Sequence, residues 1–502
     1  MKRILCIFLC LTALFAVCSC SADNAASGRS VRMMMDTKPE NIDPQLAETV
    51  EELAVVRNCF EGLFRYDNGS VLTAACKEYT VSDDGLEWNF TLCDGLNWSD
   101  GAAVTAQDFV FGIQRAITPD TVAREAELLS CIKGADAVLS GSAPAESAAV
   151  SAPDDTTVRI ILSKRADNLP EILCRAICMP CRRDVFEKAA GKYGMSSELI
   201  VCNGPYSLAS IGDSSVKLTA NESYGGKFIR SYSSVSISCG STDADRISNL
   251  SNQLADIAFI SSPSADEADA AGLDVIMFKD TAWIIAVNPQ AEVLGEEAVS
   301  AAIKSSLDSS AYSDALPFGF SAFGGVIADD LRAGNSKYSD LAGIRQPLSG
   351  SENAQENLIA ALKSHKGKLE AINLIYPDGY DLKQTAARIA QYWQQQIGIV
   401  VNISSVSSSK LKSDVKSGSY QMALVPVSAE DGMVSSALSG IAEMNLTQYA
   451  GEADPTQAEQ KILSDGHVIP IAQSGRCIAV SSGSEGARFD LFEGAAALYT
   501  LP

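Results

Sequence analysis

The chain has 502 residues, of which 46% are hydrophobic and 20% are charged. This composition excludes a disordered or fibrous protein, and at about 150 residues per domain the length predicts about three domains. The chain carries 39 basic and 62 acidic residues, so its net charge is −23 and phosphate backbones would repel it. We therefore expect no nucleic-acid partner. His365 and His467 are the only histidines, which argues against a histidine-rich metal site.

The N-terminal sequence has the pattern of an export signal. Lys2 and Arg3 precede an apolar stretch at 4–17 that is too short to span a bilayer and is typical of a secretory signal. The stretch ends in VCSC, and a small residue before Cys20 resembles the lipobox of bacterial lipoproteins. We expect a signal peptide over 1–20, a lipid on Cys20 and a flexible tether over 21–30. Cleavage without lipidation is the alternative.

This pattern predicts an extracytoplasmic protein that is held on the cell membrane by its lipid alone. The sequence leaves open whether that location is a periplasm or the outer face of a cytoplasmic membrane. No later stretch is long and apolar enough to predict a transmembrane helix.

The first half of the chain predicts strands, a hairpin and two helices. An apolar run at 31–35 predicts a strand, and apolar spacing at 51–64 predicts a helix. Asp83-Asp84-Gly85 separates two runs of alternating apolar residues, which is a strong hairpin signal. Thr105 is placed to cap a helix that begins at Ala106. The Ser-, Ala- and Pro-rich stretch at 141–155 predicts a loop.

The second half predicts a parallel strand–helix–strand unit. The strand is expected at 369–376 and the helix at 382–397, with Gly398 as its C-terminal cap and a second strand at 399–403. Further short strands are expected at 158–162, 216–218, 235–237 and 256–260. The overall prediction is a mixed α/β fold.

The cysteines and histidines give no pattern that supports catalysis. Cys174, Cys178 and Cys181 have the spacing that holds a four-iron cluster in some enzymes, but the expected export and the apolar surroundings favour buried or disulfide-bonded cysteines. The pairing of the ten cysteines after residue 20 is left open. The sequence contains no nucleophile elbow, zinc-binding HExxH helix or phosphate-binding loop. We therefore expect no catalytic residue, no metal and no cofactor.

Several sequence blocks resemble a known family, in the same order along the chain. They are NCFEGLFRYD at 58–67, VSDDGLEWNFTL at 81–92, DGLNWSDG at 94–101, VTAQDFVF at 104–111, NGPY at 203–206, WQQQIGI at 393–399 and VIPI at 468–471. These blocks are similar to those of the oligopeptide-binding (family 5) extracellular solute-binding proteins of ABC transporters. The resemblance covers nearly the whole chain after the tether and is most specific in its first 120 residues.

The resemblance implies a two-lobed periplasmic-binding-protein clamshell of α/β class. Lobe one (domain I) would comprise 31–60, 163–279 and 474–502, with an extra α/β domain (domain II) inserted at 61–162. Lobe two (domain III) would comprise 280–473. In such proteins the ligand lies between the lobes, and it must bind the closed form better than the open form. The implied partners are a short peptide and the permease subunits of an ABC importer, and we expect a monomer.

The resemblance also implies where a peptide would bind. Family members bind peptides mainly through backbone hydrogen bonds, with an acidic side chain on lobe two for the α-ammonium group. By position this acidic residue is Glu430, with Asp431 next to it and Val427 and Ser428 just before. On lobe one, the matching positions are Glu48 and Val50, which could pair with ligand amide groups as a strand does.

Several pocket positions depart from the family. Val427 stands where the family has a tryptophan, and Leu424 where it has a basic residue. Ser474 and the region of Glu125 stand where it has tyrosines. The expected function is a lipid-anchored substrate-binding component of an ABC importer that captures short peptides. The alternatives are a degenerate family member that binds a different solute or a protein partner, and an exported enzyme.

Overall fold

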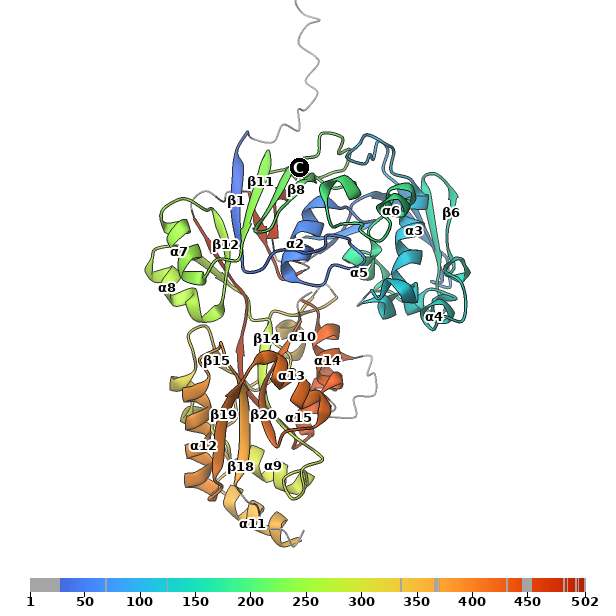
Figure 1. Ribbon diagram of the computed structural model, residues 1–502. Helices are drawn as coiled ribbons and strands as arrows, with labels where there is room; N and C mark the ends of the chain where they lie inside the picture. Colours follow the sequence, from blue (N-terminus) through green and yellow to red (C-terminus); the bar gives the residue numbers. More distant parts are fainter. Residues whose placement is uncertain are drawn as a thin grey trace, which may run out of the picture.

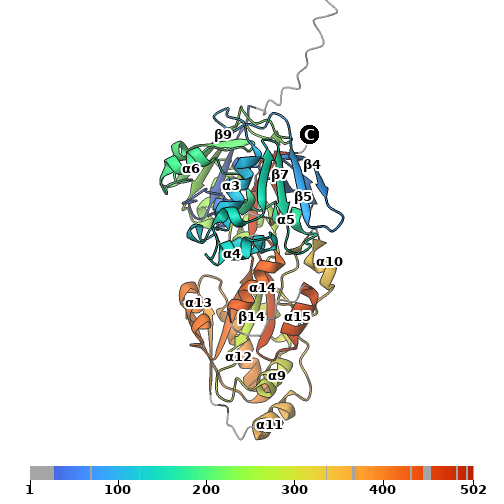
Figure 2. The ribbon, with the colours of Figure 1, turned by 90° about the vertical axis from the view of Figure 1, so that its right-hand side faces the viewer.

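The computed structural model divides the chain between two lobes, each built on its own sheet (Figure 1). The structure describes residues 28–67, 70–123, 125–334, 336–364, 369, 371–429, 432–444, 454–481, 484, 486–492, 494 and 496–500. Figure 2 shows the lobes one above the other, with the chain's start, middle and end together in lobe one. Within these residues, no helix has the length and apolar character that crossing a bilayer requires.

Lobe one contains a seven-stranded sheet of order β13-β22-β12-β1-β11-β9-β8. β1 pairs in parallel with β11 and β12, while the other pairs are antiparallel. The strands are β1 Ser30–Met35, β8 Tyr206–Ile211, β9 Ser215–Ala220, β11 Ser234–Cys239, β12 Ile257–Ile260, β13 Asp274–Met277 and β22 Cys477–Val480. Two-stranded pairs lie beside it: β10 Ile229–Arg230 with β25 Tyr499–Thr500, and β23 Arg488–Phe489 with β24 Ala496–Ala497.

The central strand β1 confirms the strand expected at 31–35. Both of its faces are covered, because Met33 packs with α2 (Val50–Cys59) in the main core while Met34 packs with α7 (Asp243–Ser251) and α8 (Ala265–Ala270). A strand that is buried on both faces has a continuous apolar run rather than alternation.

The extra domain in lobe one contains a four-stranded antiparallel sheet of order β4-β5-β7-β6. Helix α3 packs against β6 and β7, and Thr105 forms a capping box with Asp108 at its start, as expected. The expected hairpin is confirmed, with Gly85 at φ 74° in the turn between β4 and β5. The elements are β4 Cys76–Val81, β5 Glu87–Leu92, α3 Ala106–Ala116, α4 Ala135–Leu139, β6 Val150–Asp154 and β7 Thr157–Ile161. The segments around this domain include the hairpin β2 Phe64–Asp67 and β3 Ser70–Thr73, and helices α5 Leu169–Ile172 and α6 Arg183–Ala189.

Lobe two contains a six-stranded sheet of order β15-β21-β14-β20-β18-β19. Successive side chains of the inner strand β14 (Thr281–Val287) point into two different cores. Trp283, Ile285 and Val287 face one core, and Ala282, Ile284 and Ala286 face the other. The strands are β14 Thr281–Val287, β15 Ser321–Ala322, β18 Ile372–Pro377, β19 Val401–Val406, β20 Met422–Ser428 and β21 Val468–Ser474. The helices are α9 Glu297–Ser306, α10 Tyr338–Ala342, α11 Ala354–Ser364, α12 Lys383–Ile397, α13 Ser408–Ser417, α14 Val434–Glu443 and α15 Pro455–Ser464, and a small hairpin joins β16 Arg332–Ala333 to β17 Ser336–Lys337.

The expected parallel strand–helix–strand unit is confirmed in lobe two. β18 and β19 are parallel neighbours, α12 connects them, and Gly398 ends the helix in the left-handed conformation at φ 71°. The crossover packs Ile389 and Trp393 of α12 into one of the two lobe-two cores.

Two expectations about local structure are wrong. The helix expected at 51–64 ends at Cys59, because the carbonyl of Leu63 accepts hydrogen bonds from the N–H groups of Ala74 and Cys76. This tertiary pairing overrides the helical spacing of the apolar residues. The loop expected at 141–155 contains β6, which pairs with β7.

Among the cysteines of the described residues, all but Cys93 are buried. Cys174 and Cys178 direct their thiols at the carbonyls of Pro170 and Ile172. In the described ranges, no group of three or more His, Cys, Asp or Glu side chains is arranged to hold a metal ion.

Arg57 on α2 contacts both β2 and the distant C-terminal segment inside lobe one. Its side chain is 6% exposed and pairs with Asp490 at 2.7 Å. The same guanidinium donates to the carbonyls of Tyr66 at 3.0 Å and Phe492 at 2.6 Å, and to the hydroxyl of Tyr499 at 3.2 Å. One side chain on α2 therefore holds β2 and the C-terminal segment in place.

We expect Arg57→Ala to destabilise the protein by about 3–5 kcal/mol, because it leaves the Asp490 carboxylate and two carbonyls buried without their donor. Chemical denaturation followed by tryptophan fluorescence measures the change. The matched control is Arg159→Ala, which removes a solvent-exposed ion pair with Glu87 and should change stability little. Equal losses for the two variants would contradict the role of Arg57.

Candidate functional site between the lobes

The chain crosses between the lobes twice, and the two crossovers lie side by side. One joins β13 to β14 through 278–280, and the other joins β21 to β22 through 475–476. The N–H of Phe278 donates to the carbonyl of Arg476 at 2.9 Å. A side chain on Gly475 would overlap the carbonyl oxygen of Phe278, so glycine permits this close approach. These paired crossovers are the only covalent connections between the two sheets in the described chain.

An ion pair at the crossovers holds the segment that follows β20. The Arg476 guanidinium pairs with Asp280, which is buried, and donates to the carbonyl of Ala429 at 3.2 Å. The sequence analysis did not identify Arg476 or Asp280. They are far apart in the chain, and neither lies in a motif that marks it.

The structure places Ser428 at the end of the lobe-two sheet that adjoins the crossovers. Thr281 lies opposite Ser428 on β20 and opposite Ser474 on β21. Ser428 is exposed there, as an expected ligand contact must be. Glu430 and Asp431, the expected acidic residues, lie outside the described residues.

The expectation for Val427 needs correction. Its side chain is 1% exposed and packs in the core of lobe two, because strand alternation directs it away from the face that Ser428 uses. A ligand therefore has no access to the Val427 side chain in this structure. Ser474 is also buried, at 4% exposed, and its hydroxyl accepts a hydrogen bond from the Trp283 indole at 2.7 Å.

The lobe-one segment that was expected to pair like a strand is a helix N-terminus. Val50 is the first residue of α2, and Thr49 and Glu52 form a capping box. The Glu52 carboxylate also accepts the N–H of Glu48 at 3.0 Å and that of Asn41 at 3.2 Å. The Glu48 N–H is therefore already occupied, and the exposed Glu48 side chain is what this segment offers to a ligand. Thr49-x-x-Glu52 before an apolar run is the signal that could have predicted this.

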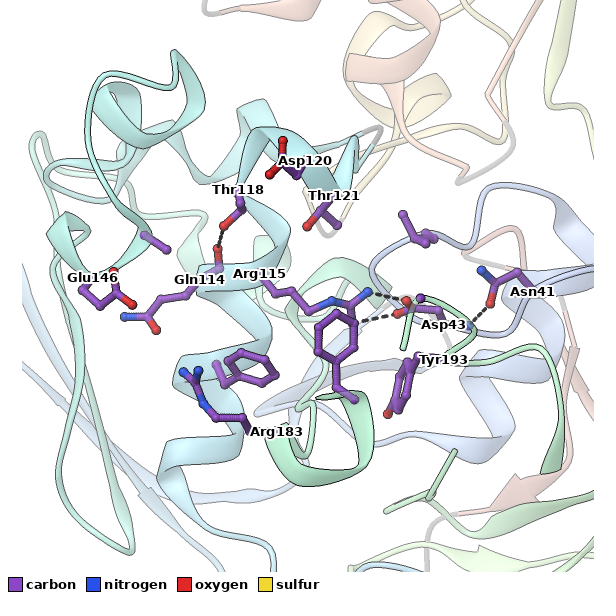
Figure 3. Close-up of a pocket in the computed structure, with 15 residues that line it drawn as sticks. Asn41, Asp43, Gln114, Arg115, Thr118, Asp120, Thr121, Glu146, Arg183 and Tyr193 are labelled. Carbon is purple, nitrogen blue, oxygen red and sulfur yellow. Dashed lines mark hydrogen bonds and ion pairs between the residues drawn. The ribbon is translucent and has the colours of Figure 1, made fainter. Parts of the chain in front are cut away.

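Lobe one also contains a pocket of about 370 Å³ beside the same loop (Figure 3). Its floor is an ion pair between Asp43 and Arg115, and Arg115 also donates to Gln45 at 2.6 Å and lies 4.2 Å from the centre of the Phe186 ring. Burial raises the pKa of Asp43, and the Arg115 charge opposes that rise. The charges of the floor thus satisfy each other, and they anchor the loop that leads to Glu48. Of the expected ligand residues that the structure describes, none lines this pocket.

The two lobes touch at a second place, which adjoins a crossover because the N–H of Asp330 donates to the carbonyl of Lys279 at 2.9 Å. Arg332 of lobe two lies 5.2 Å from the centre of the Tyr66 ring of lobe one. Met433 of lobe two packs with the core of lobe one, and a side chain on Gly432 would come within 2.6 Å of the Leu491 carbonyl oxygen. Ala429 is therefore held by the Arg476 contact, while Gly432 lies at this cross-lobe contact.

Two α/β lobes joined by paired crossovers define a bilobal binding protein. A family comparison gives the same class: the model of the bacterial extracellular solute-binding proteins, family 5 Middle, matches residues 42–443. The chain belongs to this family.

The curated relatives match over part of their length. The Dipeptide-binding protein of Lactococcus lactis subsp. cremoris (strain MG1363) is 31% identical over 183 residues, which are 36% of this chain and 33% of that protein. The Oligopeptide-binding protein OppA of Bacillus subtilis (strain 168) is 30% identical over 197 residues, 39% of this chain and 36% of that protein. The chain thus spans about a third of the length of these relatives.

Solved structures match over nearly the whole chain. Listeria monocytogenes OppA bound to peptide has a TM-score of 0.70 and 18% identity, and the match covers 95% of this chain and 99% of that one. The substrate-binding domain of an oligopeptide ABC transporter from Bacillus anthracis has a TM-score of 0.71 and 19% identity, with 95% and 99% coverage. At this identity the likeness establishes the fold, which is the two-lobed clamshell that the sequence predicted.

We expect Gly475→Ala to disrupt the paired crossovers, because the added methyl group would have to displace the backbone of Phe278. Overpacking of this kind costs about 1–3 kcal/mol. Differential scanning calorimetry measures it as a lower melting temperature. The control is Gly440→Ala in α14, where nothing lies within 4 Å of the added atom and alanine should stabilise the helix. Unchanged stability of Gly475→Ala would contradict the tight pairing of the crossovers.

Proposed function

We propose that this protein is the lipid-anchored substrate-binding component of an ABC importer, which captures short peptides between its lobes and delivers them to a membrane permease. The observation that carries the proposal is the family match over 42–443 on a chain that folds into two lobes joined by paired crossovers. The names of the relatives, which include dipeptide- and oligopeptide-binding proteins, support peptides as the ligand class. No reaction is catalysed in this function.

The chemistry of peptide capture fits the groups at the lobe boundary. Extended peptides of any sequence share a backbone and an N-terminal ammonium group, so a binding site can recognise them without contacting particular side chains. In this proposal Glu430 and Asp431 hold the ammonium group, while Ser428 at the end of β20 and the exposed Glu48 side chain contact the rest of the ligand. The permease then recognises the closed form, and the lipid on Cys20 keeps the protein at the extracytoplasmic face of the membrane.

A second candidate is a family member that binds a different solute or a protein partner. Specific observations favour it: Val427 and Ser474, which stand where the family has aromatic residues, are both buried and directed into lobe two. In this second candidate, neither side chain contributes to a peptide contact.

Native mass spectrometry of residues 21–502, purified under mild conditions, tests the proposal. A ladder of adduct masses that fragment as short peptides supports peptide capture, and a single discrete mass supports the second candidate. A protein without adducts is then tested with peptide pools by thermal shift. Peptides at about 100 times their dissociation constant should stabilise the protein by about 2.7 kcal/mol. No shift at these concentrations would contradict peptide binding.

We expect Glu430→Ala to weaken the binding of free-amine peptides by about 10–150-fold, because a hydrogen bond to a charged group contributes about 1.5–3 kcal/mol. N-acetylated peptides, which lack the ammonium group, should be affected much less. Titration calorimetry with matched peptide pairs measures the difference. The control is Glu443→Ala, which removes an exposed carboxylate from the same lobe. Equal losses for both kinds of peptide would exclude the ammonium role.

A further inference from the structure

The second contact between the lobes joins a cation to an aromatic ring. Arg332 belongs to the β16–β17 hairpin of lobe two, and its guanidinium carbon lies 5.2 Å from the centre of the Tyr66 ring on β2 of lobe one. Figures 1 and 2 both show α10, which directly follows the hairpin, at the end of lobe two that faces lobe one. A cation within about 6 Å of a ring centre is attracted by the negative face of the ring.

The Tyr66 ring is a fixed platform. It is 2% exposed and stacks on the Phe492 ring at 4.7 Å with 23° between the planes. Arg57 holds both residues through their carbonyl oxygens, and the neighbouring Asp67 pairs with Arg488 at 2.6 Å. Burial raises the pKa of the Tyr66 hydroxyl to about 12, so the ring stays neutral. Lobe one therefore presents a rigid, water-poor surface, on which a cation–π contact is strongest.

On lobe two, the cation is joined to the segment expected to bind ligand. The N–H of Arg332 donates to the carbonyl of Gly432 at 2.9 Å, and Arg332 forms a parallel bridge with Met433. Gly432 follows directly after the expected ligand residues at 427–431. Met433 packs in the apolar core of lobe one, beside the close approach of Gly432 to Leu491. Movement of Arg332 relative to Tyr66 therefore also moves the end of the ligand segment.

We propose that Arg332 and Tyr66 form a cross-lobe latch that favours contact between the lobes before ligand arrives and so sets the affinity for ligand. The effect of the latch on ligand affinity rests on the proposed function. The latch affects affinity through the population of the binding-competent form. If this form is a fraction f of the ligand-free protein, the observed dissociation constant is the intrinsic dissociation constant divided by f. Arg332 acts as a positioning residue, because it works through the lobe arrangement and the Gly432–Met433 segment.

Small-angle X-ray scattering of the ligand-free protein tests the latch directly. We expect Arg332→Gln to increase the radius of gyration, and Tyr66→Leu to do the same because it removes the ring but keeps an apolar side chain. Arg332→Lys, which keeps the cation, should restore the wild-type value in large part. The control is Lys410→Ala in α13 of the same lobe, since Lys410 pairs at 2.9 Å with Asp414 of its own helix. It should leave the radius unchanged.

Ligand affinity gives the second measurement. Arg332→Gln and Tyr66→Leu should each weaken the binding of a captured peptide about tenfold, which corresponds to about 1.4 kcal/mol. The double variant should be no weaker than the single variants, because both remove the same contact. Urea denaturation of each variant identifies any that fails to fold. Comparing Arg332→Lys with Arg332→Gln then shows whether the effect depends on the positive charge of the side chain or on its size.

Three results would overturn the latch: an unchanged radius in Arg332→Gln, the same change in Lys410→Ala, or additive losses in the double variant. The scattering measurement requires no ligand, so it judges the latch even if the wild-type protein binds no peptide. Failure of the wild-type protein to bind peptide would count against the proposed function alone.

Discussion

The buried guanidinium of Arg57 is the interaction on which the arrangement of lobe one depends. Lobe one is assembled from the start, the middle and the end of the chain, and such an assembly needs contacts that cross long sequence distances. Arg57 supplies them through Asp490, Phe492 and Tyr499. Burying a charge without a partner is costly, so the C-terminal segment must return to α2 for the lobe to be stable.

A second buried network lies beside it and uses the same block of sequence. Glu61 pairs with Arg65 at 3.7 Å and accepts a hydrogen bond from the Tyr224 hydroxyl. Arg65 is packed over the rings of Phe228 and Tyr499. Burial raises the pKa of Glu61, and the Arg65 charge opposes that rise. Both networks end at Tyr499, so the residues at 57–66 fix the C-terminal segment twice.

The sequence predicted the parts of the fold that short-range signals determine. The turn at Gly85, the capping box at Thr105 and the cap at Gly398 each act within a few residues, and all three are in the structure. The end of α2 at Cys59 and the strand β6 were missed, because both depend on backbone pairing with other segments. Periodicity cannot reveal such pairing.

In the candidate site, too, contacts between distant segments could not be predicted from the sequence. Ser428 is exposed at the end of β20, and its contact with ligand stays a prediction. The direction of Val427 could not be predicted, since it depends on the register of β20 against β14. Arg476, Asp280 and Arg332 carry no motif, and their partners become neighbours only when both lobes are formed.

The contacts of Arg476 and Arg332 both adjoin the segment expected to bind ligand. Arg476 holds Ala429 at the crossovers, and Arg332 holds Gly432 at the contact with lobe one. Under the proposed function, the ligand segment is bounded in the sequence by these two held residues, so both contacts act on it. The buried Val427 and Ser474 side chains offer no surface on which a captured ligand could stack. The contacts between the lobes themselves must then supply more of the free energy that keeps the closed form populated.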